Sequence, residues 1–122
     1  MQKVKQFDIF LVNLNPTKGS EQQGIRPCLC LQSNAVGDFG RTTLIAPLTS
    51  QKVEKIYPFE FLIEPTVKNK IKNLSKVNLS QIKVVDKERI IKKIGTLEDK
   101  YFDFFKIALE NIFDLNGDFV SK

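Results

Sequence analysis

The sequence predicts a mainly β domain, built as a small β-barrel, that ends in a long C-terminal helix. Five short segments are rich in β-branched and aromatic residues and are separated by turn-forming Gly, Pro and Asn, as short strands are. Beyond residue 96 the apolar residues recur at the spacing of one helix face. Short strands in such close succession favour a small barrel over a layered parallel sheet. The 122 residues, 42% of them hydrophobic, suffice for one core, so we assign residues 1–122 to a single domain.

The five predicted strands occupy the first two thirds of the chain. Apolar and aromatic side chains dominate the first strand, whereas polar and apolar side chains alternate in the last two. Pro27 fixes the entry into the second strand, and Gly37 and Gly40 mark the turn that follows it. The expected strands are residues 7–14, 28–33, 42–47, 58–64 and 76–85.

Two helices are expected after the strands. Asp86 is the predicted N-cap of a short helix over residues 87–93, which Gly95 would end. Thr96 is the predicted N-cap of a longer helix that reaches residue 115 and has an acidic first turn, which suits the helix dipole. Its apolar face is broad enough for two packing partners, the barrel and a second subunit, so a homodimer is expected. That face consists of Tyr101, Phe104, Phe105, Ala108, Leu109, Ile112 and Leu115, widened by Phe102 and Phe113.

The residue composition limits the chemistry that this chain can perform. Cys28 and Cys30 are the two cysteines and there is no histidine, so a four-ligand zinc set is missing and both thiols are predicted to lie in or near the core. The usual acid and base near neutral pH is therefore absent. The acidic residues of positions 1–65 are scattered, unlike the clustered carboxylates of a metal-dependent nuclease, so we expect neither a metal nor another cofactor.

Charge and hydropathy indicate a cytoplasmic protein with a polyanionic partner. The net charge is +5, and residues 66–93 alone carry nine Lys or Arg against two Asp or Glu. A basic middle favours binding to a nucleic acid, although a lysine-rich solvated surface is the simpler alternative. No apolar run reaches 18 residues and the N-terminus lacks the apolar core of a signal peptide, so we expect no membrane association and a cytoplasmic location.

The most informative stretch is the loop-to-strand segment of residues 15–33. A polar loop with turn-forming proline and glycine residues leads into Arg26 and Pro27 at the start of a strand. Arg26 is thereby held on a rigid frame beside a movable loop, where a phosphate-binding or catalytic arginine would be useful. From residue types alone, a surface ion pair with Glu21 is the simpler role for this arginine.

This segment, together with four later ones, resembles the MazF/PemK family of toxin endoribonucleases. Residues 16–27 read Pro-Thr-Lys-Gly-Ser-Glu-Gln-Gln-Gly-Ile-Arg-Pro, and the family pattern is Pro-Thr-x-Gly-Ser-Glu-Gln-x-Gly-x-Arg-Pro. The resemblance covers about residues 6–97 and implies an SH3-like barrel of the MazF/CcdB type. The later matching segments, in the family's order, are Pro47-Leu48-Thr49-Ser50, Tyr57-Pro58, Gln81-Ile82-Lys83 and Asp86-Lys87-Glu88-Arg89-Ile90.

The resemblance also implies which residues act on RNA. Arg26 and Thr49 map onto the family's catalytic pair, with Arg26 stabilising the charge of the transition state and Thr49 supplying a hydroxyl that donates or relays a proton. Ser80 and Lys83 stand where the family has Asp and Arg, so this segment lacks a carboxylate base and a bidentate fork. The residues expected to contact RNA are Ser20, Glu21, Ser50, Gln81 and Lys83.

The expected activity is metal-independent cleavage of single-stranded RNA, in which the RNA's own 2′-hydroxyl is the nucleophile and the products carry a 2′,3′-cyclic phosphate and a 5′-hydroxyl. The resemblance further implies the toxin of a type II toxin–antitoxin system, whose partner is a cognate antitoxin with a tail that competes with RNA. A CcdB-like gyrase-binding toxin without nuclease activity and a non-catalytic RNA-binding module are the alternatives. The lack of tryptophan and the presence of Arg26 and Thr49 favour the nuclease. A turn-capping hydroxyl remains the simpler role for Thr49, and the general base is left open.

Overall fold

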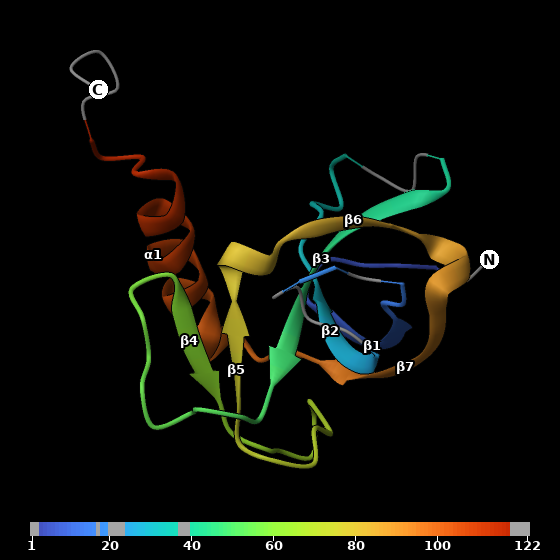
Figure 1. Ribbon diagram of the computed structural model, residues 1–122, viewed down its shortest axis with the longest axis horizontal. Coiled ribbons are helices and arrows are strands. Elements are labelled where there is room, and N and C mark those ends of the chain that lie inside the picture. Colours follow the sequence, from blue (N-terminus) through green and yellow to red (C-terminus); the bar gives the residue numbers. More distant parts are fainter. Residues whose placement is uncertain (1–2, 17, 20–23, 37–39, 118–122) are drawn as a thin grey trace.

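The computed structural model describes residues 3–16, 18–19, 24–36 and 40–117, and Figure 1 shows their arrangement. The strands within this part of the chain are β1 (Asp8–Asn13), β2 (Ile25–Cys30), β3 (Thr42–Thr49), β4 (Glu60–Ile63), β5 (Ser75–Asn78), β6 (Lys83–Asp86) and β7 (Ile90–Thr96). The helical elements are the 3-10 turns η1 (Leu79–Gln81), η2 (Lys87–Arg89) and η3 (Asp99–Tyr101) and the helix α1 (Phe102–Phe113). The prediction of a mainly β chain with a C-terminal helix is confirmed.

The strands form one antiparallel sheet that curls strongly on itself. Its hydrogen-bonded order is β4-β5-β3-β2-β1-β7, and β6 pairs with β3 beside this path. The long β3 pairs with β6 through its first half and with β2 and β5 through its second, so it links the curled strands to β4 and β5 (Figure 1). Within the described residues this path does not return on itself, so the sheet is not closed into the expected barrel.

Both faces of the curled strands are apolar, because alternate side chains point into two different cores. Phe10 and Val12 of β1 pack inside the curl with Cys28 of β2. Ile9 of β1 and Leu29 of β2 point the other way, into a larger core that β4, β5 and α1 cover. Cys28 and Cys30 are both fully buried, as the sequence predicted.

The segment of residues 76–96 differs from its predicted structure. The single strand expected over residues 76–85 is two strands, because the Asn78 side chain accepts a hydrogen bond from Ser80 N and begins η1 between them. The helix expected over residues 87–93 is wrong. Asp86 does cap a turn there, but the turn ends after three residues and the chain continues as β7 along the free edge of β1. Pairing with an open strand edge satisfies more backbone groups than a short isolated helix would.

The C-terminal helix is shorter than predicted. Thr96 lies in β7 and does not cap it, and η3 precedes its first turn. Asp114, with φ of 54°, ends the helix in the left-handed conformation. Phe105 and Ala108 face the core, whereas Phe104 and Ile107 are each 56% exposed. Within the described residues no helix has the length and apolar character to cross a membrane.

Candidate functional site

Arg26 lies near the start of β2, where the chain leaves the loop. It pairs with Val12 of β1 in the antiparallel ladder, and its side chain is half-buried. Gly24, with φ of +82°, turns the chain into the strand, a conformation that favours glycine. Leu14 N donates to Gly24 O over 2.9 Å, which closes the base of the loop two residues before Arg26.

Thr49 is the last residue of β3 and lies at the same end of the sheet as Arg26. The last pair between β2 and β3 joins Cys28 to Pro47, and Arg26 and Thr49 each lie two residues beyond it, toward the same end of the two strands. Thr49 is 8% exposed, and its Oγ1 accepts a hydrogen bond from Gln51 N over 3.1 Å. The turn-capping role is therefore present, and it leaves the hydroxyl proton to be donated elsewhere.

A groove of about 720 Å³ is lined by Arg26 and by Ser50, the residue after Thr49, whereas Thr49 itself is not among its lining residues. Four lysines from two separate segments face it, so positive charge gathers in a concave surface, which raises the local concentration of anions. The remaining lining is mostly apolar. The lysines are Lys70, Lys72, Lys92 and Lys93, and the other lining residues are Leu11, Ile25, Pro27, Leu48, Ile71, Asn73, Ser75 and Ile94.

The four lysines were not among the site residues that the sequence singled out. The four lysines lie in the basic stretch of residues 66–93, which was recognised only as a whole. The number of charges in a segment does not show which of its lysines share a surface in the fold. The connection between β4 and β5, which carries Lys70 and Lys72, brings two of them to the groove. β7 brings the other two, and this strand was predicted as a helix.

A hydrogen-bond cluster around the buried Asn69 fixes the connection between β4 and β5. Asn69 is fully buried, and its Nδ2 donates to Glu64 O over 2.9 Å and to Glu98 Oε1 over 3.1 Å. Thr66 Oγ1 donates to the other carboxylate oxygen of Glu98. Although burial alone raises the pKa of Glu98, hydrogen bonds from Thr66, from the backbone N–H of Glu98 itself and from Asn69, together with the charge of Lys100, hold this pKa below its ordinary value. An ionised Glu98 therefore anchors the lysine-bearing connection.

The other predicted RNA-contacting residues do not line this groove. Lys83 begins β6 and lines a separate pocket of about 150 Å³ together with Pro16, Asp86 and Arg89. Gln81 is half-buried at the end of η1 and lines neither of these two pockets. Ser20 and Glu21 lie outside the described residues.

Arg26 and Lys83 nevertheless act on the same buried group. Burial raises the pKa of the Cys28 thiol to about 12, and the positive charges of Arg26 and Lys83 oppose that rise. The positive charges of both cations therefore act on a group in the inner core of the curl. A thiol with this pKa stays protonated at neutral pH and is no nucleophile.

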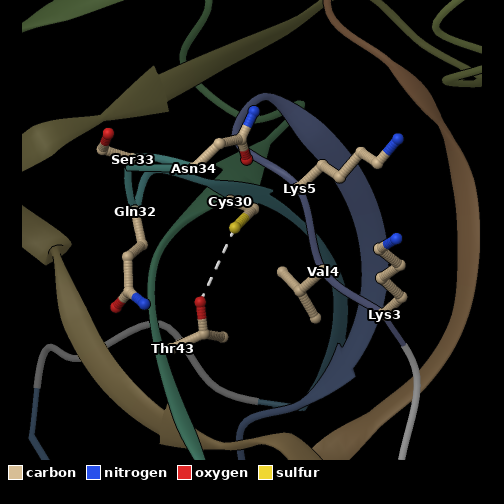
Figure 2. A pocket seen from close by; sticks show the side chains of 8 residues that line it. All are labelled: Lys3, Val4, Lys5, Cys30, Gln32, Ser33, Asn34 and Thr43. Carbon is tan, nitrogen blue, oxygen red and sulfur yellow. Dashed lines mark hydrogen bonds between the residues drawn. The ribbon is translucent and has the colours of Figure 1, made fainter. Parts of the chain in front are cut away.

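A third pocket, of about 320 Å³, lies at the mouth of the curl and holds none of the predicted site residues. Figure 2 shows Cys30 and Thr43 pointing toward one another inside it, with Cys30 Sγ and Thr43 Oγ1 3.6 Å apart, and Val4 pointing into the same space. Burial raises the pKa of Cys30 as well, so this thiol is also protonated. In the described part of the chain, no three His, Cys, Asp or Glu side chains lie together as metal ligands would.

Comparison with known proteins places this arrangement in one family. Residues 5–113 match the family of PemK-like, MazF-like toxins of type II toxin–antitoxin systems. The endoribonuclease EndoA of Bacillus subtilis is 33% identical over 107 residues, which are 88% of this chain and 91% of the relative. The endoribonuclease MazF of Staphylococcus saprophyticus is 33% identical over 97 residues, 80% of either chain.

The fold agrees with this match. A mycobacterial endoribonuclease solved in complex with its cognate antitoxin superposes with a TM-score of 0.74 at 16% identity, covering 92% of this chain and 96% of that one. The family match spans most of the chain and includes the segments that carry Arg26, Thr49 and the four groove lysines. The chain is therefore a member of the PemK-like, MazF-like toxin family of type II toxin–antitoxin systems.

Proposed function

We propose that this protein is an endoribonuclease toxin that cuts single-stranded RNA without a metal ion. The observation that carries the proposal is the position of Arg26, which lines a groove together with four lysines and with Ser50, the residue after Thr49. Arg26 and Thr49 both lie two residues beyond the last β2–β3 pair, at the same end of the two strands. The groove lysines contact RNA phosphates without regard to sequence. The relatives that are 33% identical are named endoribonucleases.

The reaction is a transesterification in which the RNA supplies the nucleophile. The 2′-oxygen forms a bond to the neighbouring phosphorus and loses its proton, while the bond from phosphorus to the 5′-oxygen breaks and that oxygen gains a proton. The products are a 2′,3′-cyclic phosphate and a 5′-hydroxyl. Arg26 stabilises the negative charge that grows on the phosphate oxygens, because a guanidinium donates to two of them at once. A guanidinium offers hydrogen-bond donors and no acceptor, so this role is electrostatic.

Thr49 acts on the proton side of the reaction. Gln51 N donates to its hydroxyl oxygen and so orients the group, and the hydroxyl proton is then available to a phosphate or leaving oxygen. Ser50 lines the groove next to it and contacts the RNA. Ser20, Glu21, Gln81 and Lys83 are proposed as further RNA contacts, on the strength of the family motif rather than of their places in a single chain.

The physiological setting follows from the family. We infer a cytoplasmic homodimer whose activity a cognate antitoxin blocks by laying an acidic or amphipathic segment across the basic groove. The side chains of α1 that would lie at a subunit contact include Phe104, Ile107 and Phe113, each more than half exposed. Light scattering at micromolar concentration should give twice the mass of the chain, and a stable monomer would count against the dimer.

The deciding experiment incubates the purified protein with a long RNA of mixed sequence in EDTA and maps the new 5′ ends. We expect discrete cuts that carry 5′-hydroxyl groups. Arg26→Ala should slow them by roughly 10²-fold, as loss of one transition-state donor does in other enzymes. Arg41→Ala is the matched control, because Arg41 is exposed and lines none of the three pockets described above. Uncut RNA together with inhibited DNA supercoiling would instead support the gyrase-binding alternative.

A further inference from the structure

Arg89 belongs to a family segment to which the proposed chemistry gives no role. Asp86 Oδ1 accepts a hydrogen bond from Glu88 N over 2.9 Å and so closes the turn η2 around it. From this turn the Arg89 side chain reaches across to the end of β1. There its Nη1 donates to Asn13 O over 3.2 Å and also to Asn15 O. The guanidinium therefore holds the chain at the point where it leaves β1 for the loop.

The side chain of Asn15 binds the backbone at the other end of the loop, at Gly24. Its Oδ1 accepts a hydrogen bond from Gly24 N over 3.0 Å, and the neighbouring Leu14 N donates to Gly24 O over 2.9 Å. Gly24 is two residues from Arg26, and Asn13 pairs with the intervening Ile25. A continuous set of hydrogen bonds thus runs from Arg89 through Asn15 and Gly24 to the backbone that bears Arg26.

We propose that Arg89 is a positioning residue for RNA cleavage, which sets the place of Arg26 through Asn15 and Gly24; this inference rests on the function proposed above. A transition-state contact loses its effect steeply with misplacement, since an error of about 1 Å can cost 10²-fold in rate. The carbonyl oxygens that Arg89 binds fix its guanidinium in the frame of the protein. Arginine suits this task, because its planar group is less strongly hydrated than an ammonium and presents its donors in a fixed geometry.

The competing role for Arg89 is direct contact with an RNA phosphate, since it lines the small pocket that also holds Lys83. The two roles predict different kinetics. A phosphate contact raises RNA affinity and makes that affinity more dependent on salt. A positioning contact instead raises the rate at which bound RNA is cleaved. The groove lysines supply most of the charge for binding, so loss of the positioning contact should leave affinity unchanged.

The experiment compares Arg89→Gln with Lys87→Met, a matched variant in the same turn. Lys87 Nζ donates to Gly40 O in the connection between β2 and β3, so Lys87→Met also removes a cation that binds a backbone carbonyl, but away from Arg26. Single-turnover kinetics give the rate at which bound RNA is cleaved. Binding of an RNA with a 2′-deoxy nucleotide at the cut site, which lacks the nucleophile, gives the affinity without cleavage. Arg89→Gln should lower the rate by roughly 10- to 100-fold at unchanged affinity, and Lys87→Met should cleave at the wild-type rate.

A second pair of variants tests the same path without touching Arg89. Asn15→Ala removes the acceptor for Gly24 N and should lower the rate as Arg89→Gln does, whereas Asn15→Asp keeps an acceptor oxygen and should restore it. Hydrogen exchange at the Leu14 and Gly24 amides should speed up in Arg89→Gln and Asn15→Ala. If Arg89→Gln does not fold, the Asn15 pair decides the matter.

Each remaining result overturns the inference in a recognisable way. Folded Arg89→Gln and Asn15→Ala variants that cleave at the wild-type rate would show that Arg26 needs no such support. Weaker binding by Arg89→Gln with a shallower salt dependence, and an unaffected Asn15→Ala, would make Arg89 a phosphate contact. A wild-type protein that leaves RNA uncut would refute the proposed function itself, and this inference with it.

Discussion

The hydroxyl of Thr49 combines a structural and a chemical role in one group. Its oxygen accepts from Gln51 N and so stabilises the turn after β3, while its proton remains for the substrate. A group with both roles is held in one rotamer before RNA binds. Thr49 can therefore cap the turn and also act as a catalytic hydroxyl.

Replacing Thr49 separates shape from chemistry. Thr49→Val keeps the volume of the side chain but removes the hydroxyl, so we expect cleavage to slow by roughly 10²-fold, at the lower end of proton-transfer effects. Thr49→Ser keeps the hydroxyl and should cleave at close to the wild-type rate. Single-turnover rates measure both, with thermal melting as the check on folding. Equal rates for the two variants would refute a role for the hydroxyl.

Cys28 makes stability depend on pH in the alkaline range. Below its ordinary pKa of 9.0 the thiol is protonated in both the folded and the unfolded protein. Its contribution to the free energy of unfolding therefore does not change with pH in this range. Above pH 9.0 the unfolded thiol ionises, while burial keeps the folded one protonated up to a pKa of about 12. The free energy of unfolding should therefore fall by up to about 1.4 kcal/mol per pH unit between these two values. Urea unfolding of wild type and Cys28→Ala at roughly pH 8 to 11 should show a steeper decline for the wild type. Parallel curves would contradict this.

At the scale of elements, the strands β4 and β5 are joined by a buried ion pair. Lys76 Nζ lies 3.0 Å from Glu60 Oε1, and the two side chains are 7% and 2% exposed. Lys76 Nζ also donates to Lys55 O over 3.1 Å, and Glu60 Oε1 accepts from Tyr57 N over 3.0 Å. The pair thus fixes the connection that follows Thr49 and Ser50, because both of its members bind the backbone there.

Breaking this pair should be costly. Glu60→Gln keeps the shape of the side chain but leaves the charge of Lys76 buried without a counter-charge, so we expect a loss of roughly 3–5 kcal/mol in the free energy of unfolding. Lys93→Met is the contrasting variant. Lys93 Nζ lies 3.2 Å from Asp8 Oδ1, and the Lys93 side chain is half exposed whereas that of Asp8 is 7% exposed. Because the Asp8 carboxylate keeps its hydrogen bonds from Lys5 N and Thr96 Oγ1, the loss of Lys93 should cost less than that of Glu60. Urea unfolding measures both, and similar losses would contradict the argument from burial.

Gly95 lets β7 approach the connection that carries Lys70 and Lys72. A Cβ at this position would lie 2.4 Å from Asn69 O, a backbone atom that side-chain movement cannot remove. Gly95→Ala should therefore cost about 1–3 kcal/mol and, by displacing the two lysines, weaken RNA binding. Gly40→Ala is the control, since Gly40 has φ of +64° and open space around it. It should lose stability through backbone strain but keep its RNA affinity, as measured by unfolding and by filter binding.

At the scale of the whole molecule, the distribution of charge directs the RNA to one groove. The net charge of +5 would attract RNA to any part of the surface, but the groove gathers lysines from two segments that lie far apart in the sequence. Concave surfaces of one charge concentrate the field, so binding should depend on these lysines more than on others.

Two double variants of equal charge test this. Lys70→Gln with Lys72→Gln removes two groove cations, so the slope of log affinity against log salt should fall in magnitude by about 1.4, at about 0.7 for each phosphate of a single strand. Lys3→Gln with Lys5→Gln removes two cations that line the pocket at the mouth of the curl and should leave the slope unchanged. Equal effects of the two variants would show that net charge alone governs binding.

Sequence reasoning predicted the elements wherever local chemistry decides the structure. The first strand and the apolar face of α1 follow from strand-favouring composition and helical spacing, which act over a few residues. The turn predicted at Gly37 lies outside the described residues. The segment of residues 87–96 was predicted wrongly, because Ile90, Ile91 and Ile94 suit a helix face as well as a strand. The free edge of β1, far away in the sequence, is what makes this segment a strand.

The sequence by itself determined the mainly β class, the family and the candidate pair Arg26 and Thr49, since each of these depends on short motifs in a fixed order. The tertiary structure alone decided that Lys70, Lys72, Lys92 and Lys93 share a groove with Arg26, while Lys83 lines another pocket. It likewise decided that Arg89 reaches the base of the loop that precedes Arg26. The physical reason is that each residue type has its own charge and hydrogen-bonding groups, whereas the fold decides which residues come into contact. Strand pairing brings together positions some 75 residues apart, such as Arg89 and the end of β1.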